Sequence, residues 1–125
     1  VVRAMLPMLR KSERAVVVNI SSIASVTANG SNVIYCASKA ALDNMTKSLA
    51  RALAPRIRVL AVSPGLVDTE FIANLDEQWR NEQVAKTPLK SLATPRHVAE
   101  AVVAATLLSF TTGAVIPVDG GRPLS

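Results

Sequence analysis

The sequence has few of the residues that build disulfides, metal sites or aromatic binding surfaces. Its 125 residues include one cysteine, one histidine and only 3% aromatic side chains. A single cysteine, Cys36, excludes an internal disulfide and suits a reducing compartment, and its surroundings favour a small packed residue. Without a CxxC motif or a second potential ligand close to His97, the sequence indicates no metal site. We expect His97 to be a surface residue near the start of a helix.

Long apolar runs are also missing. No stretch reaches the roughly 18 apolar residues that a membrane-spanning helix needs, and no signal peptide is recognisable. We therefore expect a soluble, cytoplasmic protein with no membrane partner. The hydrophobic fraction of 50% is nevertheless high enough for a real core, and 125 residues fit one domain.

Acidic residues are scarce in the first half of the chain only. Residues 1–62 hold nine basic and two acidic side chains, whereas residues 63–125 hold five and seven, for an overall charge of +5. A basic chain invites a nucleic-acid interpretation. Here the basic residues are scattered, and few aromatic rings are available to stack on bases. We expect no nucleic-acid partner.

The chemistry of the chain is concentrated between residues 14 and 47. Residues 15–20 form a run of mostly β-branched side chains, which is typical of a parallel strand buried on both faces. Two serines, the second being Ser22, follow at the carboxyl end of this strand, where open α/β sheets bind ligands. After an Asn29-Gly30 turn signal, a helix is predicted from about residue 33 to residue 54.

Tyr35 and Lys39 lie four residues apart in the first turns of this helix, and therefore on one face. At 100° per residue, the face within about 40° of Tyr35 also carries three leucines, Leu42, Leu49 and Leu53. The reactive pair therefore heads the stripe that faces the core, and it must point back toward the strand that carries Ser22.

These three side chains suit acid-base chemistry on a carbonyl or alcohol. A phenol transfers protons poorly near neutral pH, but a fixed ammonium such as that of Lys39 favours its ionised form. Ser22 can donate a hydrogen bond to the substrate oxygen. A Tyr four residues before a Lys is, by itself, more typical of a packed ring and a solvated charge, and two serines are typical of a strand-end cap. The residues alone leave both interpretations open.

The order and spacing of Ser22, Tyr35 and Lys39, in the stretches VVNISSIAS and YCASKAAL, resemble the catalytic core of the classical short-chain dehydrogenase/reductase family. The stretch IRVLAVSPGLVDT, residues 57–69, resembles the next strand of that family and its Pro-Gly turn. The stretch TGAVIPVDGG, residues 112–121, resembles its last strand. The resemblance therefore covers almost the whole chain.

This resemblance implies hydride transfer between NAD or NADP and a carbonyl or secondary-alcohol substrate. Ser22 would orient the substrate oxygen, and Tyr35 would transfer the proton. Lys39 would favour the phenolate and bind the nicotinamide ribose, so that Tyr35 and Lys39 would both meet the cofactor. The nicotinamide end would also be met by Pro64, Gly65, the main chain of Val67 and the hydroxyl of Thr69. Leu60 stands where the family often has Asn, and a leucine side chain cannot form the supporting hydrogen bond of that Asn.

Several features of the family do not occur in the chain. These are the glycine-rich pyrophosphate turn T-G-x-x-x-G-x-G, the residue that reads the adenine ribose, and the Asn of the catalytic tetrad. We therefore expect residues 1–125 to be the C-terminal part of a single NAD(P)-binding, Rossmann-like domain whose nucleotide-binding half is absent from this chain. The segment by itself is expected to be inactive.

The expected fold is α/β, with three parallel strands and crossover helices forming part of a doubly wound, Rossmann-like sheet. Residues 58–62 and 114–118 are the second and third predicted strands, and residues 1–11 are the end of a helix kinked by Pro7. Thr94-Pro95 is predicted to start a helix that runs to about residue 108. Its apolar side would consist of Val98, Val102, Ala105 and Leu108.

Residues 70–92 are predicted to form short helices that cover the substrate. The pocket or its rim would include Phe71, Ile72, Leu75 and Trp79, for which plain helix packing is the alternative. The resemblance also implies a homodimer or homotetramer. The far side of the helix that carries Tyr35 would contribute small and polar residues to it, Ala37, Ala40, Ala41, Asn44 and Ser48. The alternative function is a non-catalytic family member that keeps the fold for binding or regulation.

Overall fold

The structure, a computed structural model, describes residues 1–124 with the exception of the side chains of Phe71 and Ala73. Three strands form one parallel sheet in the order β1-β2-β3, with bounds β1 (Ala15–Ile20), β2 (Ile57–Pro64) and β3 (Val115–Val118). Two long helices make the crossovers, α3 (Val33–Leu53) and α6 (Pro95–Leu107). The α/β architecture of three parallel strands with crossover helices is therefore confirmed.

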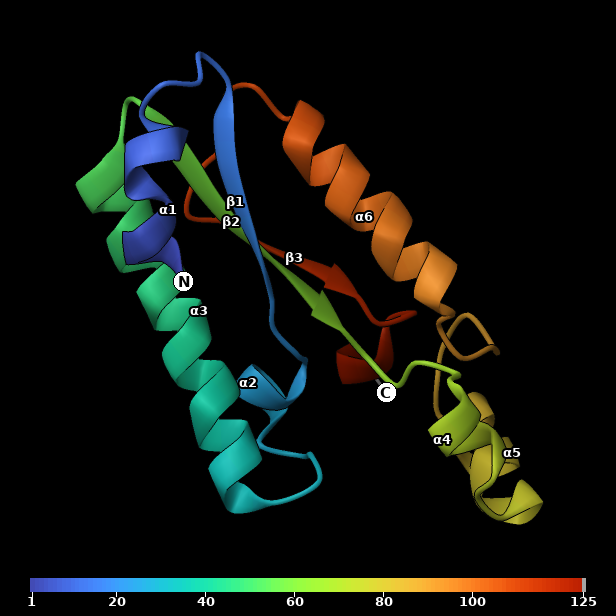
Figure 1. The fold of residues 1–125 in the computed structure, drawn as a ribbon. Helices are drawn as coiled ribbons and strands as arrows, with labels where there is room; N and C mark the ends of the chain where they lie inside the picture. The colour runs from blue at the N-terminus through green and yellow to red at the C-terminus, as the bar shows by residue number, and fades with distance from the viewer. Residues whose placement is uncertain (125) are drawn as a thin grey trace.

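Helices cover both faces of the sheet, as in a doubly wound fold. On one face lie α3 and the N-terminal helix α1 (Val2–Leu9), and on the other lies α6 (Figure 1). Short helices gather beyond the carboxyl ends of the strands, namely α2 (Ala24–Thr27), α4 (Glu70–Ala73), α5 (Glu77–Ala85) and the 3₁₀ turn η1 (Arg122–Leu124). That end of the sheet is where the candidate site lies.

The core is built on β2, the central strand. Ile57 and Val59 pack with Ala15 and Ala50 in the principal cluster, and the partly buried side chains around it are Leu6, Leu9, Val17, Leu49 and Leu53. Leu60 and Val62 are also fully buried. A parallel strand covered on both faces needs such an almost continuous apolar sequence. Of the predicted leucine stripe of α3, Leu49 and Leu53 pack against this core, and Leu42 is half-buried outside the cluster.

Three sequence expectations need correction. Val16 to Asn19 in β1 are half-buried and Ile20 is exposed, because β1 lies at an edge of the described sheet. Leu108 is 42% exposed, since α6 ends at Leu107 and the chain then turns away. Between the predicted strand and the predicted helix the sequence indicated no regular element, but residues 24–27 form the short helix α2.

Two polar contacts fix the crossovers. The Nδ2 amide of Asn19 in β1 donates to Oγ1 of Thr46 at 2.9 Å, and that hydroxyl donates to the carbonyl of Leu42 at 2.9 Å. Thr46 is completely buried within α3. At the other crossover, the guanidinium of Arg58 donates to the carbonyls of Thr106 and Leu108 at 2.9 and 2.7 Å, which satisfies the exposed carbonyl end of α6.

We predict that Thr46→Val lowers the free energy of unfolding by roughly 1 to 3 kcal/mol, because the Asn19 amide keeps its place without an acceptor. Urea unfolding of the full-length protein measures this change. Thr106→Val is the matched control, since the exposed Thr106 hydroxyl donates only within its own helix, to the carbonyl of Val103. Equal losses in the two variants would contradict the role assigned to the Asn19-Thr46 contact.

Candidate active site

Ser22 lies just past the end of β1, where the pairing with β2 continues. The N–H of Ser21 donates to the carbonyl of Val62 at 2.7 Å, and the N–H of Ile23 donates to the carbonyl of Pro64 at 3.0 Å. The Ser22 hydroxyl accepts a hydrogen bond from the N–H of Ala24 at 3.2 Å. No described residue accepts the hydroxyl hydrogen itself. Ser22 is thus held firmly and keeps a donor for a ligand.

Tyr35 is set by the turn that precedes α3. The N-cap residue Asn32 accepts a hydrogen bond from the N–H of Tyr35 at 2.8 Å. A Cβ atom at Gly30 would lie 2.9 Å from Cδ1 of Tyr35 and 3.0 Å from Sγ of Cys36. Only glycine lets the loop approach the ring so closely, which explains the Asn-Gly signal in the sequence. Cys36 is half-buried and packs here as a small residue.

Lys39 connects the helix to the strand. Its Nζ donates to the carbonyl of Ile20 at 2.9 Å, and it lies 5.7 Å from the centroid of the Tyr35 ring. The ammonium therefore sits between the carboxyl end of β1 and the predicted proton-transfer residue. An ammonium has three donors, and the carbonyl of Ile20 uses one of them.

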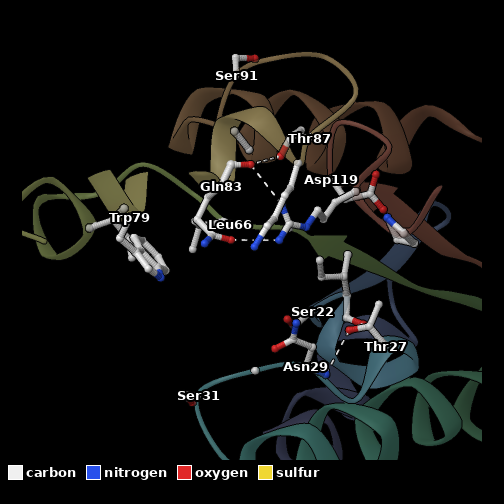
Figure 2. Close-up of a pocket in the computed structure, with 18 of the residues that line it drawn as sticks. Ser22, Thr27, Asn29, Ser31, Leu66, Trp79, Gln83, Thr87, Ser91 and Asp119 are labelled. Atoms are coloured by element: carbon white, nitrogen blue, oxygen red, sulfur yellow. Dashed lines mark hydrogen bonds between the residues drawn. The ribbon is translucent and has the colours of Figure 1, made fainter. Parts of the chain in front are cut away.

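A cavity of about 990 Å³ opens at this end of the sheet. One wall comes from the chain between β1 and α3, with Ser22, Thr27, Asn29 and Ser31 (Figure 2). The opposite wall comes from α5 and the loop after it, with Trp79, Gln83, Thr87 and Ser91. The ends of β2 and β3 contribute Gly65, Leu66 and Asp119. The cavity therefore joins segments from both halves of the sequence.

Three of the seven predicted catalytic and cofactor-binding residues line this cavity. Ser22, Tyr35 and Gly65 line it, as do Ile72, Leu75 and Trp79, for which pocket and packing roles had been left open. The side chain of Phe71 lies outside the described residues. Pro64 is buried at the end of β2, and Thr69 is exposed at the start of α4. Lys39, Val67 and these two residues are not among the residues that line the cavity.

The main chain of Val67 is presented for binding. Val67 forms an isolated parallel bridge with Ala93, in which the N–H of Asp68 donates to the carbonyl of Ala93 and the N–H of Ala93 donates to the carbonyl of Leu66. In a parallel bridge the central residue directs its own N–H and C=O to the other side. Among the described residues, neither group of Val67 has a hydrogen-bond partner.

Sequence reasoning missed the polar residues of the far wall and floor. These are Gln83, Lys86, Thr87, Asp119 and Arg122. They come from a charged helix and from the last turn of the chain, and no local pattern indicated that the two segments meet. His97 proved to have a structural role, because its Nδ1 accepts from the N–H of Thr94 while its own N–H donates to Oγ1 of Thr94. This capping box starts α6.

Two absences hold over the described part of the chain. It contains no group of three or more histidine, cysteine, aspartate or glutamate residues arranged to hold a metal ion. It also has no helix of sufficient length and apolar character to span a bilayer.

Comparison with known proteins identifies the family. The family described as Enoyl-(Acyl carrier protein) reductase matches residues 1–122. The chain is 38% identical to the short-chain dehydrogenase/reductase homolog YusR of Bacillus subtilis over 98% of its own length and 94% of that protein. It is 36% identical to the 3-oxoacyl-[acyl-carrier-protein] reductase FabG of Thermotoga maritima over 97% of its length, which spans only 50% of FabG.

The fold has a close counterpart among solved structures. A small-chain dehydrogenase in complex with NADPH superimposes with a TM-score of 0.86 and 30% identity, over 99% of this chain and 58% of that one. Apart from YusR, these relatives are about twice as long as this chain. The match to the family extends over nearly all 125 residues and includes the segments that border the cavity. The chain therefore belongs to the short-chain dehydrogenase/reductase family.

Proposed function

We propose that the chain supplies the proton-transfer and substrate-binding part of an NAD(P)-dependent oxidoreductase that interconverts a carbonyl and a secondary alcohol. The observation that carries this proposal is the shared cavity of Ser22 and Tyr35, with the ammonium of Lys39 placed beside the Tyr35 ring. A binding module would have no need for all three groups at one strand end. Family membership and the NADPH complex of a relative support the choice of cofactor.

The residues present fit the nicotinamide end of such a cofactor. The N–H and C=O of Val67 form an unpaired donor and acceptor next to Gly65 and Leu66, which line the cavity. A carboxamide offers the complementary acceptor and donor. Lys39 keeps donors for a ribose hydroxyl, and Pro64 and Thr69 frame the same turn. The cofactor would supply or accept the hydride, and NAD and NADP share this nicotinamide end.

The protein side chains would manage the proton. In reduction, the Tyr35 hydroxyl would donate its proton to the carbonyl oxygen as negative charge develops there, and in oxidation the phenolate would remove it. Ser22 would hold that oxygen in place through its free hydroxyl hydrogen. Lys39 would stabilise negative charge on the phenol oxygen, because the hydrogen bond to Ile20 keeps the ammonium close to the ring.

We predict that Tyr35→Phe lowers turnover by about 10² to 10⁴, because general acid-base catalysis is typically worth that factor. Turnover of NADPH and NADH by the full-length protein against a panel of ketones and secondary alcohols measures it. Cofactor affinity should stay nearly unchanged, since only the phenol oxygen is removed. Near-normal turnover would reject the assignment and favour a non-catalytic role for this family member.

Lys39→Met should reduce both turnover and cofactor affinity, because the ammonium is assigned two functions. Fluorescence titration with NADPH measures the affinity separately from the kinetics. The exposed Lys47, on the same helix, provides the matched control, and Lys47→Met should change neither quantity. A Lys39→Met variant altered only in its substrate KM would refute both functions.

A further proposal concerns assembly through the outer face of α3. Its small and polar residues are all exposed, namely Ala37, Ala40, Ala41, Asn44 and Ser48. Another helix could therefore approach closely, as in the homodimers or homotetramers that the family resemblance implies. We predict that Ala41→Arg lowers the mass of the full-length protein in light scattering and leaves the reactive face intact. An unchanged mass would count against this face.

We also propose that residues 1–125 act as the C-terminal part of a larger NAD(P)-binding domain. The outer edge of β1 has no neighbouring strand among the described residues, and Ile20 is 46% exposed there. An apolar open edge promotes aggregation. We predict that residues 1–125 expressed alone show no cooperative thermal transition and no NAD(P)H binding. A monomer with native near-UV circular dichroism and micromolar cofactor affinity would show instead that the segment is self-sufficient.

A further inference from the structure

Helix α5 forms a wall of the cavity without the usual means of attachment. Trp79 and Gln83 line the cavity, yet none of the nine residues of α5 is buried. A helix at a protein surface is normally held by an apolar stripe that packs on the core. The position of α5 must therefore depend largely on polar contacts, and two arginines provide them.

The first contact lies near the start of the helix. The guanidinium of Arg80 forms an ion pair with the carboxylate of Asp68, with 3.1 Å between Nη2 and Oδ2. Both side chains are mostly shielded, at 26% and 37% exposed. The N–H of Asp68 donates to the carbonyl of Ala93 at 2.7 Å, so the carboxylate stands on a fixed main chain. Arg80 thus ties α5 to the segment after β2 that carries Val67.

The second contact lies near the end of the helix. Arg122, in the last turn of the chain, donates from Nη1 to the carbonyl of Gln83 at 3.1 Å and from Nη2 to Oε1 of Gln83 at 3.0 Å. The planar guanidinium serves both oxygens at once, with two of its N–H donors held in a fixed geometry. Figure 2 shows these bonds as dashed lines that end at Gln83, on the opposite wall from Ser22.

The turn that carries Arg122 is itself locked against the segment after α5. A Cβ atom at Gly120 would lie 2.6 Å from Cγ2 of Thr87, and the φ angle of Gly120 is +63°, so no other residue fits there comfortably. The N–H of Leu89 donates to the carbonyl of Gly120 at 3.1 Å. Arg122 therefore extends from a turn of fixed conformation, and its hydrogen bonds restrain the position of Gln83.

We propose that Arg80 and Arg122 are positioning residues that hold α5, and with it Trp79 and Gln83, across the cavity from Ser22 and Tyr35. The effect of the two arginines on turnover rests on the proposed function, whereas their effect on the position of α5 does not. The width of the substrate space is set by these two arginines, although neither is assigned a role in proton transfer. Loss of either arginine lets the α5 wall move outward and lowers the affinity for the substrate.

Trp79 provides a direct readout, because it is the only tryptophan among the 125 residues and precedes Arg80 in α5. Acrylamide quenching of its fluorescence is measured in the full-length protein, with a Trp79→Phe variant as the blank. We expect Arg80→Met and Arg122→Met to raise the quenching constant several-fold and to shift the emission to longer wavelength. The control is Arg96→Met, which breaks an exposed ion pair with Glu100 outside the cavity and should change nothing.

Kinetics with NADPH and the probe ketones cyclohexanone and ethyl acetoacetate give the second readout. Arg122→Met should raise the KM of a reduced ketone about tenfold, since hydrogen bonds from a charged donor are the strong ones, while kcat changes much less. Arg122→Lys should restore part of the loss in both readouts. If Arg80→Met and Arg122→Met match Arg96→Met in quenching, the proposal is wrong. If neither ketone is reduced, the proposed function loses support, and quenching alone decides the proposal.

Discussion

The candidate site depends on the parallel pairing of β1 with β2 beyond the formal end of β1. The bonds from Ser21 to Val62 and from Ile23 to Pro64 carry the ladder past Ile20. They hold the segment of Ser22 against the strand that leads to Gly65. Since β2 is the most deeply buried element, this pairing gives the site a rigid foundation.

Helix α3 is attached to β1 at two points. At its buried middle, Thr46 accepts the side-chain amide of Asn19, and at its first turns Lys39 donates to the carbonyl of Ile20. Both bonds end on β1, so the helix can neither slide nor rotate relative to the strand without losing one of them. The direction of the Tyr35 ring follows from this registration, and Gly30 closes the loop over it. The positions of Tyr35 and Lys39 are thus set by contacts with β1 and with the loop before α3.

Sequence reasoning recovered the elements whose signals are local. The β-branched run gave β1, the Thr94-Pro95 pair gave the start of α6, and period and spacing placed Tyr35 on the inner face of α3. It failed where burial or position depends on contacts between residues that are far apart in the sequence. Ile20 is exposed because of its place at a sheet edge, and Arg122 meets Gln83 across 39 residues of sequence. Neither fact has a signature in a window of neighbouring residues. The family resemblance added what local patterns could not, namely the prediction that Pro64, Gly65, Val67 and Thr69 meet the nicotinamide end of a cofactor.

The two walls of the cavity differ in how they are encoded. The reactive wall comes from one continuous stretch, from Ser22 to Tyr35, with Lys39 directly behind it, whereas the opposite wall combines α5, the loop after it and the last turn of the chain. Substitutions in one wall therefore need not change the residues of the other. Under the proposed function, substitutions around α5 would change which compound is bound and would leave Ser22, Tyr35 and Lys39 in place.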